Sequence, residues 1–216
     1  MQISHYAVHS NIEYSEESFE HFSDQSPGDL HKNRGYAAMV RDLDLSIGEL
    51  MEAYDELGLS EDTYVIFASD NGGMPVIPMQ VNRGRPYKSG LNSPLLRGKW
   101  DLTEGGIRVP FAVVGPGVKS GSQSDTPVVT YDLLPTVAAL AGSDSELPTD
   151  LDGGSFHAAL SDPNAPVSRP LDSLIFHYPH YNRVGMNEPH SAIREGNYKL
   201  IYFPVSDRSL LFDLSQ

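Results

Sequence analysis

Residues 63–73, Thr-Tyr-Val-Ile-Phe-Ala-Ser-Asp-Asn-Gly-Gly, join a short apolar run to a polar, glycine-containing end. The β-branched and aromatic residues of the run predict a strand buried on both faces, as in a parallel sheet. Asp70 and Asn71 fall where this strand ends, and open α/β sheets bind ligands outside the carboxyl ends of their strands. Carboxylate and amide oxygens suit a hard cation such as Ca²⁺ or Mg²⁺. Residues 70–73 also suit a β-turn without any ligand, so both interpretations stay open at this point.

The charge balance argues against several classes of partner. The formal net charge is −14, from 29 acidic and 15 basic residues, and such a surface repels nucleic acid and anionic lipid. No apolar run is long enough to span a membrane, and no cysteine is available for disulfides, thiolate zinc sites or a cysteine nucleophile. An anion site therefore requires a local group of cations or a bound metal.

Residues 74–98 have no periodic pattern and predict a long loop. Five of the fifteen cationic side chains lie within residues 83–99, a stretch with no acidic residue: Arg83, Arg85, Lys88, Arg97 and Lys99. This is the local positive group that an anion site requires, although a basic surface loop explains it equally well.

The elements before this loop follow from apolar spacing. Residues 3–8 predict a strand with His9 at its end, and a lone histidine there is more often structural than functional. Residues 13–33 predict a short helix and an exposed loop. Residues 34–57 carry apolar side chains at helical spacing and end at Gly58, a typical C-terminal cap. Helix, short loop and strand make one unit of a doubly wound sheet.

The elements after the loop change character along the chain. Residues 109–114 predict a second buried strand, residues 130–141 a helix capped by Thr130, and residues 155–160 a brief helix. The later segments predict a small antiparallel meander with turns at 195–197 and 206–208; they are 174–178, 191–194, 198–203 and 210–214. The sequence thus predicts an α/β fold in two parts, residues 1–150 and 151–216.

Five stretches resemble one family when they are taken in order. They are residues 6–10, Tyr-Ala-Val-His-Ser; 62–73, ending Ser-Asp-Asn-Gly-Gly; 96–110, with Arg-Gly-Lys-Trp and Glu-Gly-Gly-Ile-Arg-Val-Pro; 132–136, Asp-Leu-Leu-Pro-Thr; and 177–180, His-Tyr-Pro-His. The chain resembles the C-terminal half of a type I sulfatase of the arylsulfatase kind, within the alkaline-phosphatase-like superfamily. The resemblance implies that residues 1–150 are part of the catalytic α/β sheet with flanking helices, and 151–216 a small C-terminal subdomain.

The resemblance also implies roles for particular residues. Asp70 and Asn71 would ligate the catalytic Ca²⁺ or Mg²⁺, and Lys99 and His9 would contact the sulfate ester. His9 is the better candidate for protonating the leaving oxygen, because an imidazole titrates near neutral pH. His180 and His177 would contact substrate from the tail. The substrate would be a carbohydrate or aryl sulfate, and a full-length member would be expected in the periplasm or outside the cell.

The sequence departs from the family pattern in its nucleophile. The family uses a formylglycine made from the first residue of a Cys/Ser-x-Pro-x-Arg motif, and residues 161–163 and 168–170 match only its Ser-x-Pro part. We therefore expect the formylglycine, and further metal ligands, in a missing N-terminal half that acts as partner of this chain. Two alternatives remain: a phosphate or phosphonate ester hydrolase of the same superfamily, and a non-catalytic remnant that serves as an interaction module.

Overall fold

The computed structural model describes residues 1–75, 92–143 and 147–216, which divide into two compact units. Unit 1 comprises residues 1–59, 69–109 and 180–188, and unit 2 comprises residues 60–68, 110–179 and 189–216. Both units draw on segments far apart in the sequence. The division into 1–150 and 151–216 stays a prediction. None of the helices in the described ranges has the length and apolarity needed to cross a membrane.

Unit 1 contains the helices α1 (Glu16–His21), α2 (Arg34–Glu56) and α3 (Glu104–Ile107). Helix α2 confirms the predicted long helix: the Asn33 side chain caps its start, and Gly58 follows its end with φ of +69°. A small apolar cluster forms around the buried Ile12 and Met39, with Ala7 and Val8 packed against it.

Residues 3–8 do not form the predicted strand. Residues 1–6 have no regular structure, and the His9 N–H donates to the Tyr6 carbonyl at 3.0 Å to close a turn. A strand requires a neighbouring strand for its backbone groups, and within the described residues none pairs with this segment. The apolar side chains of Ala7 and Val8 instead pack on the cluster around Met39. The prediction was wrong because a short apolar run fixes burial but not backbone pairing.

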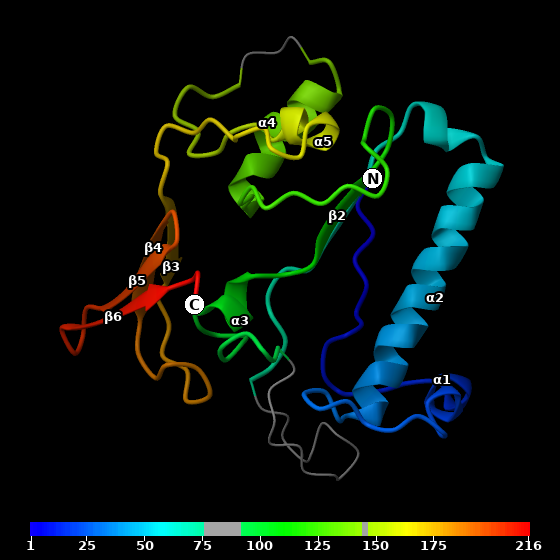
Figure 1. Ribbon diagram of the computed structural model, residues 1–216, viewed down its shortest axis with the longest axis horizontal. Helices are drawn as coiled ribbons and strands as arrows, with labels where there is room; N and C mark the ends of the chain where they lie inside the picture. Colours follow the sequence, from blue (N-terminus) through cyan, green and yellow to red (C-terminus); the bar gives the residue numbers. More distant parts are fainter. Residues whose placement is uncertain (76–91, 144–146) are drawn as a thin grey trace. The chain divides into compact units, whose positions relative to one another are not determined.

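Unit 2 contains two separate sheets (Figure 1). Strand β1 (Val65–Ala68) pairs antiparallel with β2 (Phe111–Val114), so the predicted strands exist. The expected parallel sheet buried on both faces is wrong for the described residues, because Phe67 is 39% exposed and Val114 49% exposed. Amino-acid composition identifies a strand. The strand it pairs with, the direction of that pairing and the burial of its faces depend on segments distant in the sequence.

The second sheet is the predicted meander. Strands β3 (Leu174–Tyr178), β4 (His190–Glu195), β5 (Tyr198–Phe203) and β6 (Arg208–Asp213) pair antiparallel in chain order. Strand β5 alternates between exposed and buried side chains, as expected for a sheet with one covered face. Gly196, with φ of +56°, forms the β4–β5 turn at the predicted position. The predicted α/β class with a C-terminal antiparallel meander is confirmed.

The helical part of unit 2 is held by a buried ion pair. The segment comprises the 3-10 turn η3 (Thr130–Asp132) and the helices α4 (Leu133–Leu140) and α5 (His157–Ser161); η1 (Leu59–Glu61) precedes β1. Arg169 donates to the buried Asp132 carboxylate through Nε at 2.8 Å and Nη2 at 2.6 Å. Thr130 is not the predicted cap: it begins η3, and Asp132 accepts the Val129 N–H at 2.9 Å instead.

Candidate functional site

Lys99 and His9 are brought together from segments 90 residues apart. Lys99 Nζ lies 3.1 Å from His9 Nε2, and His9 Nδ1 lies 2.9 Å from the Ser10 carbonyl oxygen. A carbonyl only accepts, so Nδ1 carries the imidazole proton and Nε2 accepts from the Lys99 ammonium. His9 is exposed and Lys99 half-buried. The pair therefore presents a fixed cation beside a basic nitrogen on the surface of unit 1.

Asp70 and Asn71 lie in the loop that follows β1. The Asn71 amide nitrogen donates to the Gly72 carbonyl at 2.9 Å, and Ser69 Oγ donates to the Asn71 carbonyl at 2.9 Å. These bonds fix the amide with Nδ2 engaged, which leaves Oδ1 as the atom that a cation could use. The Asp70 carboxylate is exposed. The two residues thus offer adjacent oxygen donors of the kind that Ca²⁺ and Mg²⁺ prefer.

The loop of residues 70–73 is tied directly to the backbone of Lys99. The Lys99 N–H donates to the Gly73 carbonyl at 2.9 Å, and the Gly72 N–H donates to the Gly106 carbonyl at 2.9 Å. A side chain on Gly72 would place its Cβ 1.7 Å from the Gly105 carbonyl oxygen, so only glycine fits there. The oxygen-bearing loop and the cationic pair consequently share one backbone framework in unit 1.

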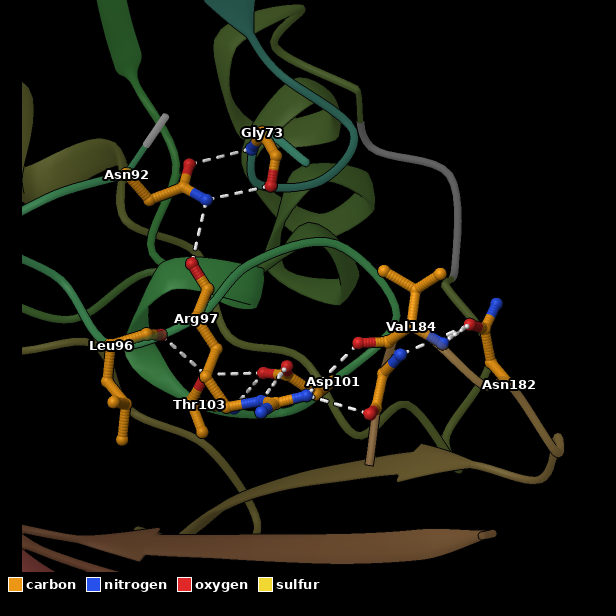
Figure 2. A network of polar contacts seen from close by, with 9 residues as sticks. Gly73, Asn92, Leu96, Arg97, Asp101, Thr103, Asn182 and Val184 are labelled. Atoms are coloured by element: carbon orange, nitrogen blue, oxygen red, sulfur yellow. Dashed lines mark hydrogen bonds and ion pairs between the residues drawn. The ribbon is translucent and has the colours of Figure 1, made fainter. Parts of the chain in front are cut away.

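Asn92 adds a second tie between the same two segments (Figure 2). Its Oδ1 accepts the Gly73 N–H at 2.8 Å, while its Nδ2 donates to the Gly73 carbonyl at 2.7 Å and to the Arg97 carbonyl at 2.9 Å. The Asn92 side-chain amide thereby bonds both backbone groups of Gly73, as a neighbouring strand would, although the two residues are 19 apart in the sequence. Sequence reasoning missed Asn92, because nothing in residues 74–98 distinguishes one loop asparagine from another.

Arg97 and Asp101 were also missed as a pair, since Arg97 entered the prediction only as one cation among five. Arg97 Nε donates to Asp101 Oδ2 at 2.8 Å, and the Asp101 side chain is fully buried. The other oxygen of Asp101 accepts from the N–H and Oγ1 of Thr103. The Arg-Gly-Lys-Trp-Asp-Leu-Thr spacing could have suggested a tight turn around Lys99. The remaining predicted cations Arg83, Arg85 and Lys88 lie outside the described residues.

The two tail histidines fall in different units. His180 is exposed and begins residues 180–188 of unit 1, whereas His177 lies in β3 of unit 2. His177 Nδ1 lies 2.8 Å from Ser191 Oγ, its cross-strand neighbour. Unit 1 therefore contains His180 as well as Lys99, His9, Asp70 and Asn71, and unit 2 contains His177.

Metal ligation by this chain would rest on Asp70 and Asn71. Within residues 1–75, 92–143 and 147–216, no three His, Asp or Glu side chains gather in a way that could hold a metal ion. Two adjacent oxygen donors fit one side of a Ca²⁺ coordination shell, which takes six to eight oxygens. The residues present therefore match part of such a site.

The fold and these side chains define an α/β protein that gathers oxygen donors, a fixed cation and an imidazole around one loop framework. A family model described as Sulfatase matches residues 1–143, and one described as N-sulphoglucosamine sulphohydrolase, C-terminal, matches residues 98–216. This chain belongs to the sulfatase family, as the sequence motifs indicated.

Individual relatives agree with this assignment. The chain is 33% identical over 202 residues to a sulfatase of Formosa agariphila, covering 86% of this chain and 34% of that protein. It is 35% identical over 185 residues to human arylsulfatase A, covering 84% and 33%. The chain thus spans about a third of the length of these relatives. Ps i-CgsB in complex with k-i-k-neocarrahexaose matches with a TM-score of 0.74 and 27% identity, over 97% of this chain and 42% of that one.

Proposed function

We propose that these 216 residues carry part of the site of a sulfuric ester hydrolase, with Lys99 and His9 on the sulfate group and Asp70 and Asn71 on a divalent cation. The observation that supports this most is the 3.1 Å contact of Lys99 with His9, on a backbone that is bonded to Gly73. The Lys99 ammonium, the His9 imidazole and a cation on Asp70 and Asn71 would then all contact one sulfate group.

Lys99 and His9 would do different work. The Lys99 ammonium is a fixed positive charge that binds sulfate oxygens and offsets the negative charge that develops during transfer. The Nε2 atom of His9 is the nitrogen without a proton in the resting arrangement, because Nδ1 donates to Ser10. Nε2 can take up a proton from solvent and donate it to the leaving oxygen as the sulfur–oxygen bond of the ester breaks. The Nδ1 bond to Ser10 keeps the ring oriented for this task.

Asp70 and Asn71 would hold Ca²⁺, or Mg²⁺, through the Asp70 carboxylate and the Asn71 Oδ1. A bound cation would polarise the sulfuryl oxygens. The remaining oxygen ligands and the formylglycine nucleophile would come from an N-terminal half of the same protein, as the resemblance implies. This partner half would complete a coordination shell that these two residues begin.

The substrate class is a sulfate ester, with a carbohydrate or an aryl group as its organic part. A carbohydrate is supported by the likeness to Ps i-CgsB, whose structure contains k-i-k-neocarrahexaose. An aryl group is supported by the similarity to arylsulfatase A. His180 would contact the organic part from unit 1. The same role is proposed for His177, which lies in β3.

Titration of the chain with inorganic sulfate in the presence of Ca²⁺ tests this function, with the NMR signals of the His9 imidazole as the readout. We expect a saturable shift of these signals. Because a charged hydrogen bond is worth about 1.5–3 kcal/mol, Lys99→Ala should weaken sulfate binding about tenfold or more.

Lys119→Ala is the matched control, because Lys119 is an exposed lysine of unit 2 and its loss removes the same net charge. This variant should bind sulfate as the unaltered chain does. Equal weakening by both variants would show that only the overall charge matters, and would overturn the proposed role of Lys99.

A further inference from the structure

We propose that Arg97 is a positioning residue that fastens residues 180–188 to residues 97–101, the Lys99 loop. This contact thereby sets the affinity for the organic part of a sulfate ester. This inference rests on the proposed function, in which Lys99 and His9 bind the sulfate group itself. We call residues 180–188 the strap.

The contacts of Arg97 join the two segments directly (Figure 2). Its Nη2 donates to the strap carbonyls of Gly185 at 2.7 Å and Val184 at 3.2 Å, across 88 and 87 residues of sequence. Its Nε donates to Asp101 at 2.8 Å. A guanidinium presents several N–H groups in a rigid plane, so it can hold a carboxylate and two carbonyls at once.

The strap is shaped to receive this guanidinium. Asn182 Oδ1 accepts the N–H groups of Val184 at 2.8 Å and Gly185 at 3.1 Å, and the Asn182 carbonyl accepts the Asn187 N–H at 3.1 Å. These bonds fold the strap back on itself and engage the amides of residues 184 and 185, while their carbonyls receive Arg97. A Cβ on Gly185 would lie 2.5 Å from the Trp100 carbonyl oxygen, so the strap packs against the residue that follows Lys99.

The backbone of the Lys99 loop has an uncommon conformation on both sides of Lys99. Arg97 has φ of +59° and Trp100 has φ of +77°, values that side-chain-bearing residues adopt only when their surroundings enforce them. Buried Asp101 provides one such constraint through its bond to Arg97. The backbone that orients the Lys99 ammonium is therefore the same backbone that carries the strap.

The strap carries side chains suited to an organic group. Tyr181 is 71% exposed and its neighbour His180 is also exposed, and aromatic rings such as phenol and imidazole can pack against a sugar or an aryl ring. The sulfate group would bind Lys99 and His9, and the ester's organic part would bind the strap. Arg97 acts through the strap and does not touch the substrate.

Arg97→Lys tests the inference, because lysine keeps a positive charge beside buried Asp101 but cannot bond both strap carbonyls. The probes are inorganic sulfate, phenyl sulfate and glucose sulfate, each titrated into the full 216-residue chain with Ca²⁺. We expect affinity for inorganic sulfate to change by less than about twofold and affinity for at least one ester to fall about fivefold to tenfold. Amide hydrogen exchange in residues 182–187 should accelerate without added ligand.

Arg34→Lys is the matched control, since Arg34 also donates through Nε and Nη2 to a backbone carbonyl, that of Phe19 in unit 1. It should leave the preference for esters unchanged. Asn182→Ala loosens the strap from its other side and should reproduce the Arg97→Lys result, which covers the case in which Arg97→Lys fails to fold.

If Arg97→Lys loses affinity equally for all three probes, or loses none for either ester, the inference is overturned. Sulfate binding by the unaltered chain would in that case still support the proposed function. If the unaltered chain binds none of the probes, the proposed function fails and the substrate role of the strap fails with it. Unchanged exchange in residues 182–187 would show separately that Arg97 does not fasten the strap.

Discussion

Among the described glycines, Gly72 has the shortest contact for an added Cβ. An added Cβ would meet the backbone oxygen of Gly105 at 1.7 Å and the carbonyl carbon of the same residue at 2.8 Å. Backbone atoms cannot rotate away as a flexible side chain can. The contact between the loop of residues 70–73 and the Lys99 segment therefore depends on the absence of a side chain at this position.

Gly72→Ala should lower the free energy of unfolding by about 3 kcal/mol or more, because overpacking at a backbone contact forces the two segments apart. Gly48→Ala provides the contrast, since nothing lies within 4 Å of its added Cβ in the middle of α2. That variant should gain about 0.5–1 kcal/mol from alanine's higher helix propensity. Urea unfolding of both variants measures the difference, and similar values for the two would contradict the interlocked framework.

Some residues of the candidate site could be predicted from their side-chain chemistry. Others could not, because their importance comes from tertiary contacts. Asp70, Asn71, Lys99 and His9 could be named because their residue types suit a cation or an anion and their motifs resemble one family. Their roles remain proposals. Asn92 could not be named, because its importance comes from bonds to Gly73 and Arg97 that exist only in the folded chain.

At the scale of elements, one carboxylate of α2 accepts several hydrogen bonds at the start of α1. Asp42 accepts from the Ser15 N–H and Oγ, both at 2.7 Å, and from Ser18 Oγ at 2.5 Å. Arg41 donates to the same Ser18 Oγ at 2.7 Å. Partial burial works to raise the pKa of Asp42, but the hydrogen bonds from Ser18 and Ser15 and the charge of Arg41 bring the pKa below its ordinary value of 3.8.

The lowered pKa of Asp42 predicts a definite pH dependence. Its contribution to stability is fully present above the pKa of the unfolded chain, about 3.9, and is lost as the pH falls through the lower folded-state pKa. Asp42→Asn should therefore be less stable than the unaltered chain at about pH 6, and this deficit should shrink below about pH 4. Asp44→Asn, an exposed change on the same helix, should show a smaller deficit. Urea unfolding of the variants and the unaltered chain across this pH range measures the stability deficit. A deficit for Asp42→Asn that does not change with pH would contradict the role of Asp42.

Helices and hairpins were predicted well because their signals are local. The apolar spacing of α2 and the turn at Gly196 lie within a few residues of the structure they specify. Strand partners were predicted poorly, since β1 pairs antiparallel with β2 across more than forty residues of sequence. Residues 3–8 failed for the same reason, because their composition suits a strand but nothing local supplies a partner.

For the whole molecule, the chain spans only part of the length of its relatives. It spans about a third of the Formosa agariphila sulfatase and of human arylsulfatase A. It contains no cysteine, and neither Ser-x-Pro sequence continues to the arginine of the nucleophile motif. Under the proposed function, these 216 residues would contribute to anion and cation binding, and the nucleophile would come from the partner half.

We predict that the 216-residue chain alone hydrolyses no aryl sulfate with Ca²⁺ or Mg²⁺ present, because none of its residues matches the nucleophile motif. Release of the phenol from an aryl sulfate measures this directly. Turnover above buffer that disappears in Lys99→Ala would show that the chain supplies its own nucleophile. Turnover that persists in that variant would indicate a contaminating enzyme.

We propose above all that Asp70 and Asn71 hold a cation close to the Lys99–His9 pair. Mn²⁺ accepts the same oxygen ligands as Ca²⁺ and broadens the NMR signals of nearby nuclei, so it reports binding and proximity in one titration. The account predicts that Mn²⁺ broadens the signals of His9 and Lys99 before those of α2 residues such as Gly48, and that Asp70→Ala removes this selectivity. Selective broadening elsewhere in the chain, or broadening of His9 and Lys99 that survives Asp70→Ala, would contradict it.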